Sequence, residues 1–185
     1  FEGLWECGIK SMKYNLKRIF HNVLTYEEML TVWCQTEACL NSRSLTPMSG
    51  DPSDLHALTP GHFLIGDSLV AAPQRDITTN KINRLTRWQL TQQLTQHFWQ
   101  RWSIEYLSRL QQRPKWWTQQ GNLKINDMVL VREDNQPPQT WKLGRIVDIH
   151  PGKDNVVRTV TVKTSGGIYK RPIVKLSKLP FETNE

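Results

Sequence analysis

The hydrophobic pattern of this chain changes its period once. Before about residue 112, apolar residues recur at intervals of three and four, which is the spacing of a helix. From Ile125 onward they alternate in short runs rich in Val, Ile and Thr, which predict strands at 128–132, 141–149, 156–164 and 168–175. Helices followed by short strands within 185 residues predict an α+β fold that ends in a small β-barrel.

Two helices are predicted at the start of the chain. The first covers residues 6–20 and carries one apolar face, made by Ile9, Met12, Leu16, Ile19 and Phe20. Thr25 and Glu28 form a capping-box pattern that begins the second helix. That helix is predicted to run to about Leu40 and to bury Met29, Leu30 and Trp33.

A long helix is predicted between residues 84 and 112, with Pro114 ending it. Its apolar stripe consists of Leu85, Trp88, Trp99, Trp102, Tyr106 and Leu110. Exposed aromatic rings could stack on nucleic-acid bases, but aromatic residues at helical spacing more often fill a core. We therefore expect Trp88, Trp99, Trp102 and Tyr106 to be packing residues, either within the chain or against another protomer.

Charge is distributed unevenly along the chain, whose formal net charge is +7. Residues 1–66 hold 5 Lys/Arg against 7 Asp/Glu, residues 67–123 hold 8 against 3, and residues 124–185 hold 11 against 7. Residues 1–66 are thus net acidic and the rest of the chain is net basic. The basic part favours a polyanionic partner such as nucleic acid, and the alternative is a solvated basic surface.

Three cysteines without a C-x-x-C pair predict a reducing, intracellular compartment and no structural metal. No apolar run has the length of a membrane span, so no membrane association is expected.

The first helix carries the clearest candidate site. At about 100° per residue, Lys10, Lys13 and Lys17 fall within a few tens of degrees of Glu6, so one carboxylate and three ammonium groups share a face. In the functional interpretation, Glu6 is a metal-binding carboxylate and Lys10, Lys13 and Lys17 bind DNA phosphates. The alternative interpretation is a solvated polar face with helical pairing of Glu6 and Lys10. One glutamate alone cannot hold Mg²⁺ well. The nearest downstream acids, Asp51 and Asp54, lie in a D-P-S-D pattern that is typical of turns.

Several stretches resemble integrases of BEL/Pao-type retrotransposons. The opening FEGLWECGIKSMKYNLKR is similar to the region around the last catalytic glutamate, and LNSRSLTP and TPGHFLIG are similar to the segments that follow it. RWQLTQQLTQHFWQRWSIEYLSRLQQRPKW resembles the linker helix, and the strands from MVLVRED to KRPIVKL resemble the C-terminal domain. The sequence departs from the family pattern at Glu2, where the family has glycine, and at Ser44, where it has proline.

The resemblance implies a domain organisation and a chemistry. Residues 1–66 would be the C-terminal remnant of an RNase H-like catalytic core, 67–83 a linker, 84–117 a long amphipathic helix and 124–180 an SH3-like domain. Glu6 would be the last of three acidic ligands for Mg²⁺ or Mn²⁺ in DNA strand transfer, with Lys10 and Lys13 holding element DNA. The family's two aspartates precede this segment, so we expect this chain by itself to be inactive and to bind no metal tightly.

Basic residues of the C-terminal strands are the second candidate site. Four basic residues lie in adjoining predicted strands and are expected to contact the phosphate backbone of duplex DNA without reading bases: Arg145, Arg158, Lys170 and Arg171.

The resemblance implies a location in the nucleus or in a cytoplasmic virus-like particle, and a homo-oligomer remains open. The alternative function is a protein-interaction or chromatin-reader-like module of a decayed or domesticated element. A methyl-lysine reader would need an aromatic cage, for which this region offers only Trp141, Tyr169 and Phe181.

Overall fold

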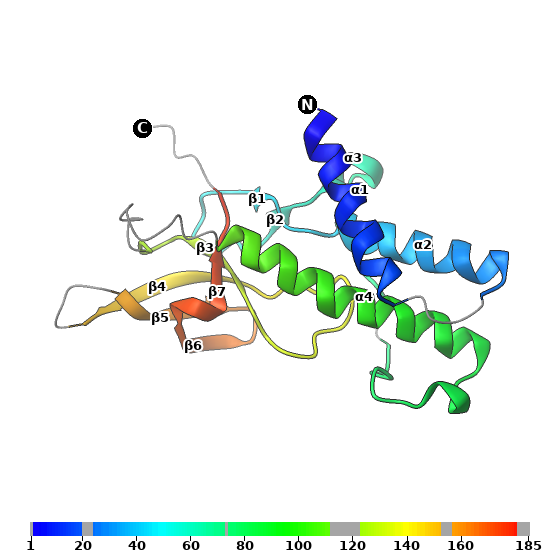
Figure 1. The fold of residues 1–185 in the computed structure, drawn as a ribbon. Coiled ribbons are helices and arrows are strands. Elements are labelled where there is room, and N and C mark those ends of the chain that lie inside the picture. Colours follow the sequence, from blue (N-terminus) through cyan, green and yellow to red (C-terminus); the bar gives the residue numbers. More distant parts are fainter. Residues whose placement is uncertain (1, 20–23, 73, 112–122, 153–156, 181–185) are drawn as a thin grey trace. The chain divides into compact units, whose positions relative to one another are not determined.

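The long helices of the computed structural model precede its five-stranded sheet in the chain, as the change in period predicts, and a short two-stranded sheet falls among the helices (Figure 1). The structure describes residues 2–19, 24–72, 74–111, 123–152 and 157–180. Its helices are α1 (Glu2–Lys17), α2 (Tyr26–Asn41), α3 (Pro60–Ile65) and α4 (Arg87–Leu110), with 3₁₀ turns η1 (Ile82–Arg84) and η2 (Ile173–Lys175). Its strands are β1 (Thr46–Pro47), β2 (Ala57–Leu58), β3 (Met128–Val131), β4 (Leu143–Pro151), β5 (Val157–Thr164), β6 (Gly167–Pro172) and β7 (Leu176–Lys178).

Two compact units share these elements, and each combines segments that are separated in the sequence. The helical unit comprises Phe1–Ser42, Leu69–Glu105 and Asn135–Thr140. The sheet unit comprises Arg43–Ser68, Tyr106–Asp134 and Trp141–Glu185. The domain boundaries predicted from the sequence follow chain order, whereas these units interleave along the chain.

Helix α2 begins as predicted and buries a different face. Thr25 and Glu28 form the capping box, in which the Glu28 carboxylate accepts a hydrogen bond from the Thr25 amide at 2.8 Å. The residues buried on α2 are Val32, Thr36 and Cys39. The expected burial of Leu30 and Trp33 is wrong, because these side chains are 46% and 49% exposed.

Helix α4 supplies most of the helical unit's core. Phe98, Trp99 and Trp102 are buried, and the rings of Phe98 and Trp102 stack with their centroids 6.2 Å apart. The packing role predicted for Trp99 and Trp102 is thus confirmed. Trp88 does not pack within this chain, since it is 57% exposed, and its packing against another protomer stays a prediction. The predicted end of this helix, residues 112–117 with Pro114, lies outside the described residues, as does Phe20 of the first helix.

The sheet unit is built on a five-stranded antiparallel sheet that curls into a half-barrel, in the order β6-β5-β4-β3-β7. One face buries a valine-rich core that includes Val129, Ile146, Val160 and Val162. Met128 and Leu130, on the other side of β3, pack with Leu107 and Leu179. Apolar residues on both sides explain why all four residues of β3 are buried.

Strand assignments from the sequence agree with the structure except at the C-terminal end. The strand expected at 168–175 ends at Pro172, which occupies the end of the edge strand β6. Strand β7 on the opposite edge was not predicted. The register irregularities of β4 fall between Ile146 and Asp148 and between His150 and Pro151, away from Gly144. Gly144 instead permits close packing, because a Cβ atom there would lie 2.4 Å from Val162 Cγ1.

The segment Arg43–Ser68 belongs to the sheet unit. Its strands β1 and β2 pair antiparallel, and Thr46 Oγ1 donates a hydrogen bond to the Pro180 carbonyl at 2.8 Å. The Ser44 carbonyl accepts a hydrogen bond from the Tyr106 hydroxyl at 2.6 Å. Burial raises the pKa of that hydroxyl to about 12. Within the part of the chain that the structure describes, no helix has the length and apolar character needed to cross a bilayer.

Candidate nucleic-acid interface

The first candidate surface lies on helix α1, in the helical unit. Glu6, Lys10, Lys13 and Lys17 are all exposed, as their helical spacing predicts. The opposite part of the helix is turned inward, where Ser11 is 7% and Asn15 is 3% exposed. The chain therefore presents one carboxylate and three ammonium groups together on an accessible face, called here the α1 basic face.

Buried polar side chains determine which side of α1 faces outward. Ser11 and Asn15 lie one turn apart and are both buried. The Glu105 carboxylate on α4 accepts hydrogen bonds from Ser11 Oγ at 3.1 Å and from Asn15 Nδ2 at 2.9 Å. Charge-assisted hydrogen bonds of this kind are stronger than neutral ones. Glu105 thus fixes the rotation of α1, and sequence analysis did not identify this contact because its partners are 90 or more residues apart.

The resemblance implies a metal site that includes Glu6. Among the described residues, no three His, Cys, Asp or Glu side chains lie close enough together to hold a metal ion. Asp51 and Asp54 have the turn role that their pattern predicts, since Asp51 accepts from the Ser53 amide and Asp54 from the His56 amide, both at 2.8 Å. These bonds lower the pKa of Asp51 and bring that of Asp54 to about 2. We derive no catalytic step from Glu6 alone.

The second candidate surface lies on the sheet unit, on the face of β5 and β6 that is turned away from the valine core. Val160 and Val162 point inward, so the residues between and after them point outward. Cross-strand pairs share a face, and Thr161 pairs with Lys170 while Lys163 pairs with Ile168. Lys163 and Lys170 are both exposed. We call Thr161, Lys163, Ile168 and Lys170 the basic sheet face.

Polar groups of β4 continue this face. His150 Nε2 lies 2.8 Å from Thr161 Oγ1, and His150 Nδ1 lies 3.8 Å from a carboxylate oxygen of Asp148. Lys163 was not among the DNA-binding residues predicted from the sequence. The alternation of valines in VRTVTVKT could have identified it, because it places Lys163 opposite the buried Val162 and Val160.

The structure gives Arg145 a different role from the predicted phosphate contact. Its residue is only 3% exposed, and its guanidinium donates to the carbonyls of Ser49, Asp54 and Asn126 at 2.8, 3.0 and 3.1 Å. Arg145 pairs across the sheet with Lys163, but the segment that contains Ser49 and Asp54 covers the arginine. Because its guanidinium N–H groups hold that segment, Arg145 is no longer a candidate DNA contact.

The adjacent residues Lys170 and Arg171 are separated onto opposite faces by the alternation of β6. The Arg171 guanidinium lies 3.7 Å from a Glu133 carboxylate oxygen and 5.2 Å from the Tyr169 ring centroid. Lys142 Nζ contacts the same Glu133 oxygen at 2.7 Å and lies 5.6 Å from the same ring. Glu133 offsets part of the positive charge here. Arg158 is exposed at the start of β5 and stays a predicted DNA contact.

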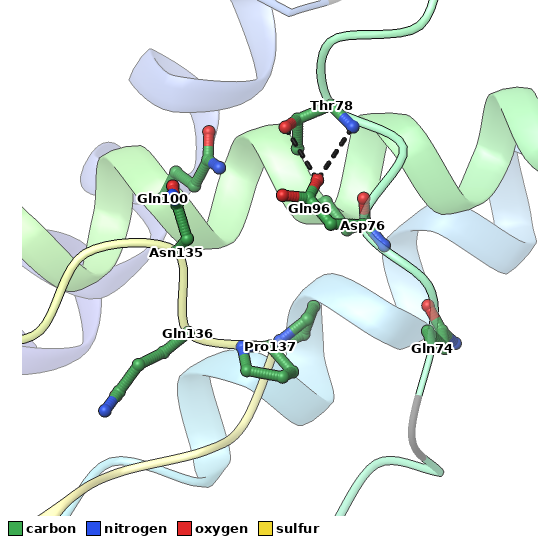
Figure 2. A pocket seen from close by; sticks show the side chains of 9 residues that line it. Gln74, Asp76, Thr78, Gln96, Gln100, Asn135, Gln136 and Pro137 are labelled. Carbon is green, nitrogen blue, oxygen red and sulfur yellow. Dashed lines mark hydrogen bonds between the residues drawn. The ribbon is translucent and has the colours of Figure 1, made fainter.

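A shallow polar pocket is present in the helical unit and does not coincide with either basic surface (Figure 2). Its lining includes Gln96 and Gln100 of α4, Asp76 and Thr78 of the segment before α4, and Asn135. The Asp76 carboxylate accepts hydrogen bonds from the Thr78 amide and hydroxyl at 3.0 and 2.7 Å (Figure 2). These bonds lower the pKa of Asp76.

Comparison with known proteins gives one family. A family model described as "Family of unknown function (DUF5641)" matches residues 86–179, which is half of the chain. The match covers α4 and the whole five-stranded sheet. No curated protein and no solved structure matches the sequence.

Proposed function

We propose that this chain, which belongs to the family of unknown function DUF5641, binds the phosphate backbone of duplex DNA as part of a retrotransposon integrase. The observation that carries the proposal is the basic sheet face, on which Lys163 and Lys170 are exposed beside a threonine hydroxyl. Ammonium and hydroxyl groups are the donors that proteins use for phosphate oxygens. No recognition helix is needed for contacts of this kind, which do not depend on sequence.

The finer assignment rests on the BEL/Pao resemblance. In it, α1 and α2 are the end of an RNase H-like core, the half-barrel is an SH3-like domain, and duplex DNA is the partner. The α1 basic face supports this proposal because Glu6, Lys10, Lys13 and Lys17 are accessible together. In the full protein Glu6 would be one ligand of a Mg²⁺ or Mn²⁺ pair that activates the attacking oxygen in strand transfer. The proposed location is the nucleus or a cytoplasmic virus-like particle.

The alternative, a chromatin-reader-like module, gains no support from the aromatic residues of the sheet unit. Tyr169 already lies beside Lys142 and Arg171. Trp141 packs edge-on against Tyr106, with ring centroids 5.5 Å apart. These two rings are thus engaged by neighbouring side chains, and Phe181, the third aromatic residue considered for a cage, lies outside the described residues.

Titration of the chain with a labelled 20-base-pair duplex tests the proposal, with anisotropy measured from 50 to 200 mM salt. Each phosphate contact contributes about −0.9 to the slope of log K against log salt. We expect the double variant Lys163→Ala/Lys170→Ala to reduce that slope by roughly two, for two unrelated duplex sequences alike. A Lys124→Ala/Lys175→Ala variant, which removes two exposed lysines outside β5 and β6, controls for net charge.

An unchanged slope in the Lys163/Lys170 variant, or an equal loss in the control, would remove the basic sheet face from the proposal. The catalytic expectation is tested separately with a Mg²⁺- or Mn²⁺-dependent strand-transfer assay of this chain. We expect no joining. Joining that is abolished by Glu6→Gln would show that the chain carries a complete active site, contrary to our expectation.

A further inference from the structure

The segment that leads into α4 carries an exposed tryptophan among cations. Residues 75–88 hold four basic residues, Arg75, Lys81, Arg84 and Arg87, against the single acid Asp76, a net charge of 4 − 1 = +3. Trp88 at the end of this segment is 57% exposed although it begins an aromatic-rich helix. A large indole ring left in water is an unusual placement, because burying such a ring is strongly favourable.

Two buried glutamines of α4 hold the first half of this segment in one path. Gln93 Nε2 donates to the carbonyls of Ile77 and Asn80 at 2.8 and 2.9 Å. Gln96 accepts from the Ile77 amide at 3.0 Å and donates to the Arg75 carbonyl at 2.9 Å. Ile77 itself is 5% exposed. Buried polar networks whose groups all find partners specify a single conformation, so these residues form an ordered loop.

Local hydrogen bonds order the second half. In the η1 turn, the Arg84 amide donates to the Lys81 carbonyl at 3.0 Å. Thr86 and Gln89 form a reciprocal cap, in which the Thr86 amide donates to Gln89 Oε1 at 3.0 Å and the Gln89 amide donates to Thr86 Oγ1 at 3.2 Å. Lys81, Arg84 and Trp88 therefore extend from a fixed backbone, and all three are exposed.

Two other charges of the segment are engaged elsewhere, and Arg75 lies further from Trp88 in the sequence. Arg87 forms an ion pair with Glu28, and Asp76 is engaged by Thr78. Apart from Arg87, which is paired, Lys81 and Arg84 are thus the cations nearest in sequence to the exposed Trp88 ring. Cations that follow a phosphate backbone, combined with an aromatic ring on which a base can stack, are the two components of sites for single-stranded nucleic acid.

We propose that residues 81–88 form a preformed binding site for single-stranded nucleic acid, with one base stacked on Trp88 and phosphates held by Lys81 and Arg84. A paired base in an intact duplex has no free face for such stacking, so unpaired strands or frayed ends are the ligands. The inference goes beyond duplex binding by the sheet unit and uses none of its residues.

Anisotropy titrations with fluorescein-labelled twelve-nucleotide oligothymidine and with a twelve-base-pair duplex test the site. Stacking on an aromatic side chain contributes enough that Trp88→Ala is expected to weaken oligothymidine binding about tenfold. Trp88→Phe retains a stacking surface and is expected to restore most of the affinity. The matched control is Trp33→Ala, which removes an equally exposed tryptophan from the acidic helix α2. Duplex affinity is expected to stay the same in all three variants.

A separate measurement tests the two cations. The variant Lys81→Ala/Arg84→Ala is expected to reduce the slope of log K against log salt for oligothymidine binding by roughly one to two. Oligothymidine affinity that is unchanged in Trp88→Ala overturns the proposal. So does a loss that is the same in Trp88→Phe, a loss shared by Trp33→Ala, or Trp88-dependent binding to anionic vesicles without binding to oligothymidine. Failure of duplex binding in the wild-type chain would count against the proposed function and leave the oligothymidine result to decide this site.

Discussion

Arg145 provides a strict test of the structure, because sequence analysis and the structure assign it opposite roles. The substitution Arg145→Met keeps most of the side-chain volume and removes every donor. The structure shows three backbone carbonyls that would lose charge-assisted hydrogen bonds, those of Ser49, Asp54 and Asn126. Hydrogen bonds to charged groups contribute about 1.5–3 kcal/mol each, which sums to roughly 4.5–9 kcal/mol as an upper bound.

Hydration of the freed carbonyl groups reduces the expected loss of stability below this sum. Ser49 and Asp54 are half-buried, so their carbonyls can be rehydrated once the segment 49–54 moves away from β4. We therefore expect Arg145→Met to lower the free energy of unfolding by about 3–5 kcal/mol, a large share of the stability of a small domain. The assay is urea denaturation of the full chain followed by far-UV circular dichroism. Lys163→Met, at the exposed cross-strand partner of Arg145, is the control and is expected to change stability by less than about 0.5 kcal/mol.

Hydrogen exchange adds a local readout. Amides of β1 and β2 are expected to lose protection in Arg145→Met, because the guanidinium holds the connection between these strands. The reasoning is refuted if Arg145→Met costs less than about 1 kcal/mol and instead reduces the salt slope of DNA binding. That outcome would return Arg145 to the phosphate-binding role predicted from the sequence.

Two further predictions concern packing and reactivity. Gly144→Ala places a methyl group against β5 and is expected to destabilise the chain by about 1–3 kcal/mol in urea denaturation, whereas Gly50→Ala, with no atom within 4 Å, is expected to be much milder. Burial raises the pKa of the Cys39 thiol to about 12, so in a Cys7→Ser variant Ellman's reagent at pH 8 is expected to label the exposed Cys34 and to leave Cys39 unmodified until the chain unfolds. Slow labelling of two thiols in the folded chain would contradict the burial of Cys39.

Local rules were sufficient for the longer helices and strands. The change from a helical to an alternating period correctly separates α4 from β3–β6, and the Thr25–Glu28 pattern identifies the start of α2. Each of these signals lies within a few residues, where propensity and capping act. Strand β7 was missed because its three residues are too short to show a period and pair only through β3.

Burial was harder to predict than secondary structure. Helical spacing groups Trp88 with Trp99 and Trp102, yet only the latter two are buried. Spacing shows which residues share a stripe and does not show where along the helix the covering segments begin and end. For the same reason the sequence favoured Leu30 and Trp33 as core residues of α2, where Val32, Thr36 and Cys39 are buried instead.

The functional assignment of charged residues fails at the sequence level for a related physical reason. Arg145 reaches carbonyls 91 and 96 residues earlier, Glu105 reaches hydroxyl and amide groups 94 and 90 residues earlier, and both use up donors or acceptors that the sequence presents as free. A buried charge is retained only where such partners satisfy it. Lys163 and Lys170 differ because both are exposed on the β5 and β6 part of their face, whereas the segment with Ser49 and Asp54 covers Arg145 on β4. Exposure on a shared strand face therefore separates a candidate DNA contact from a structural cation in this chain. The sequence could have supplied only one part of that distinction, which is the alternation of side chains along β5 and β6.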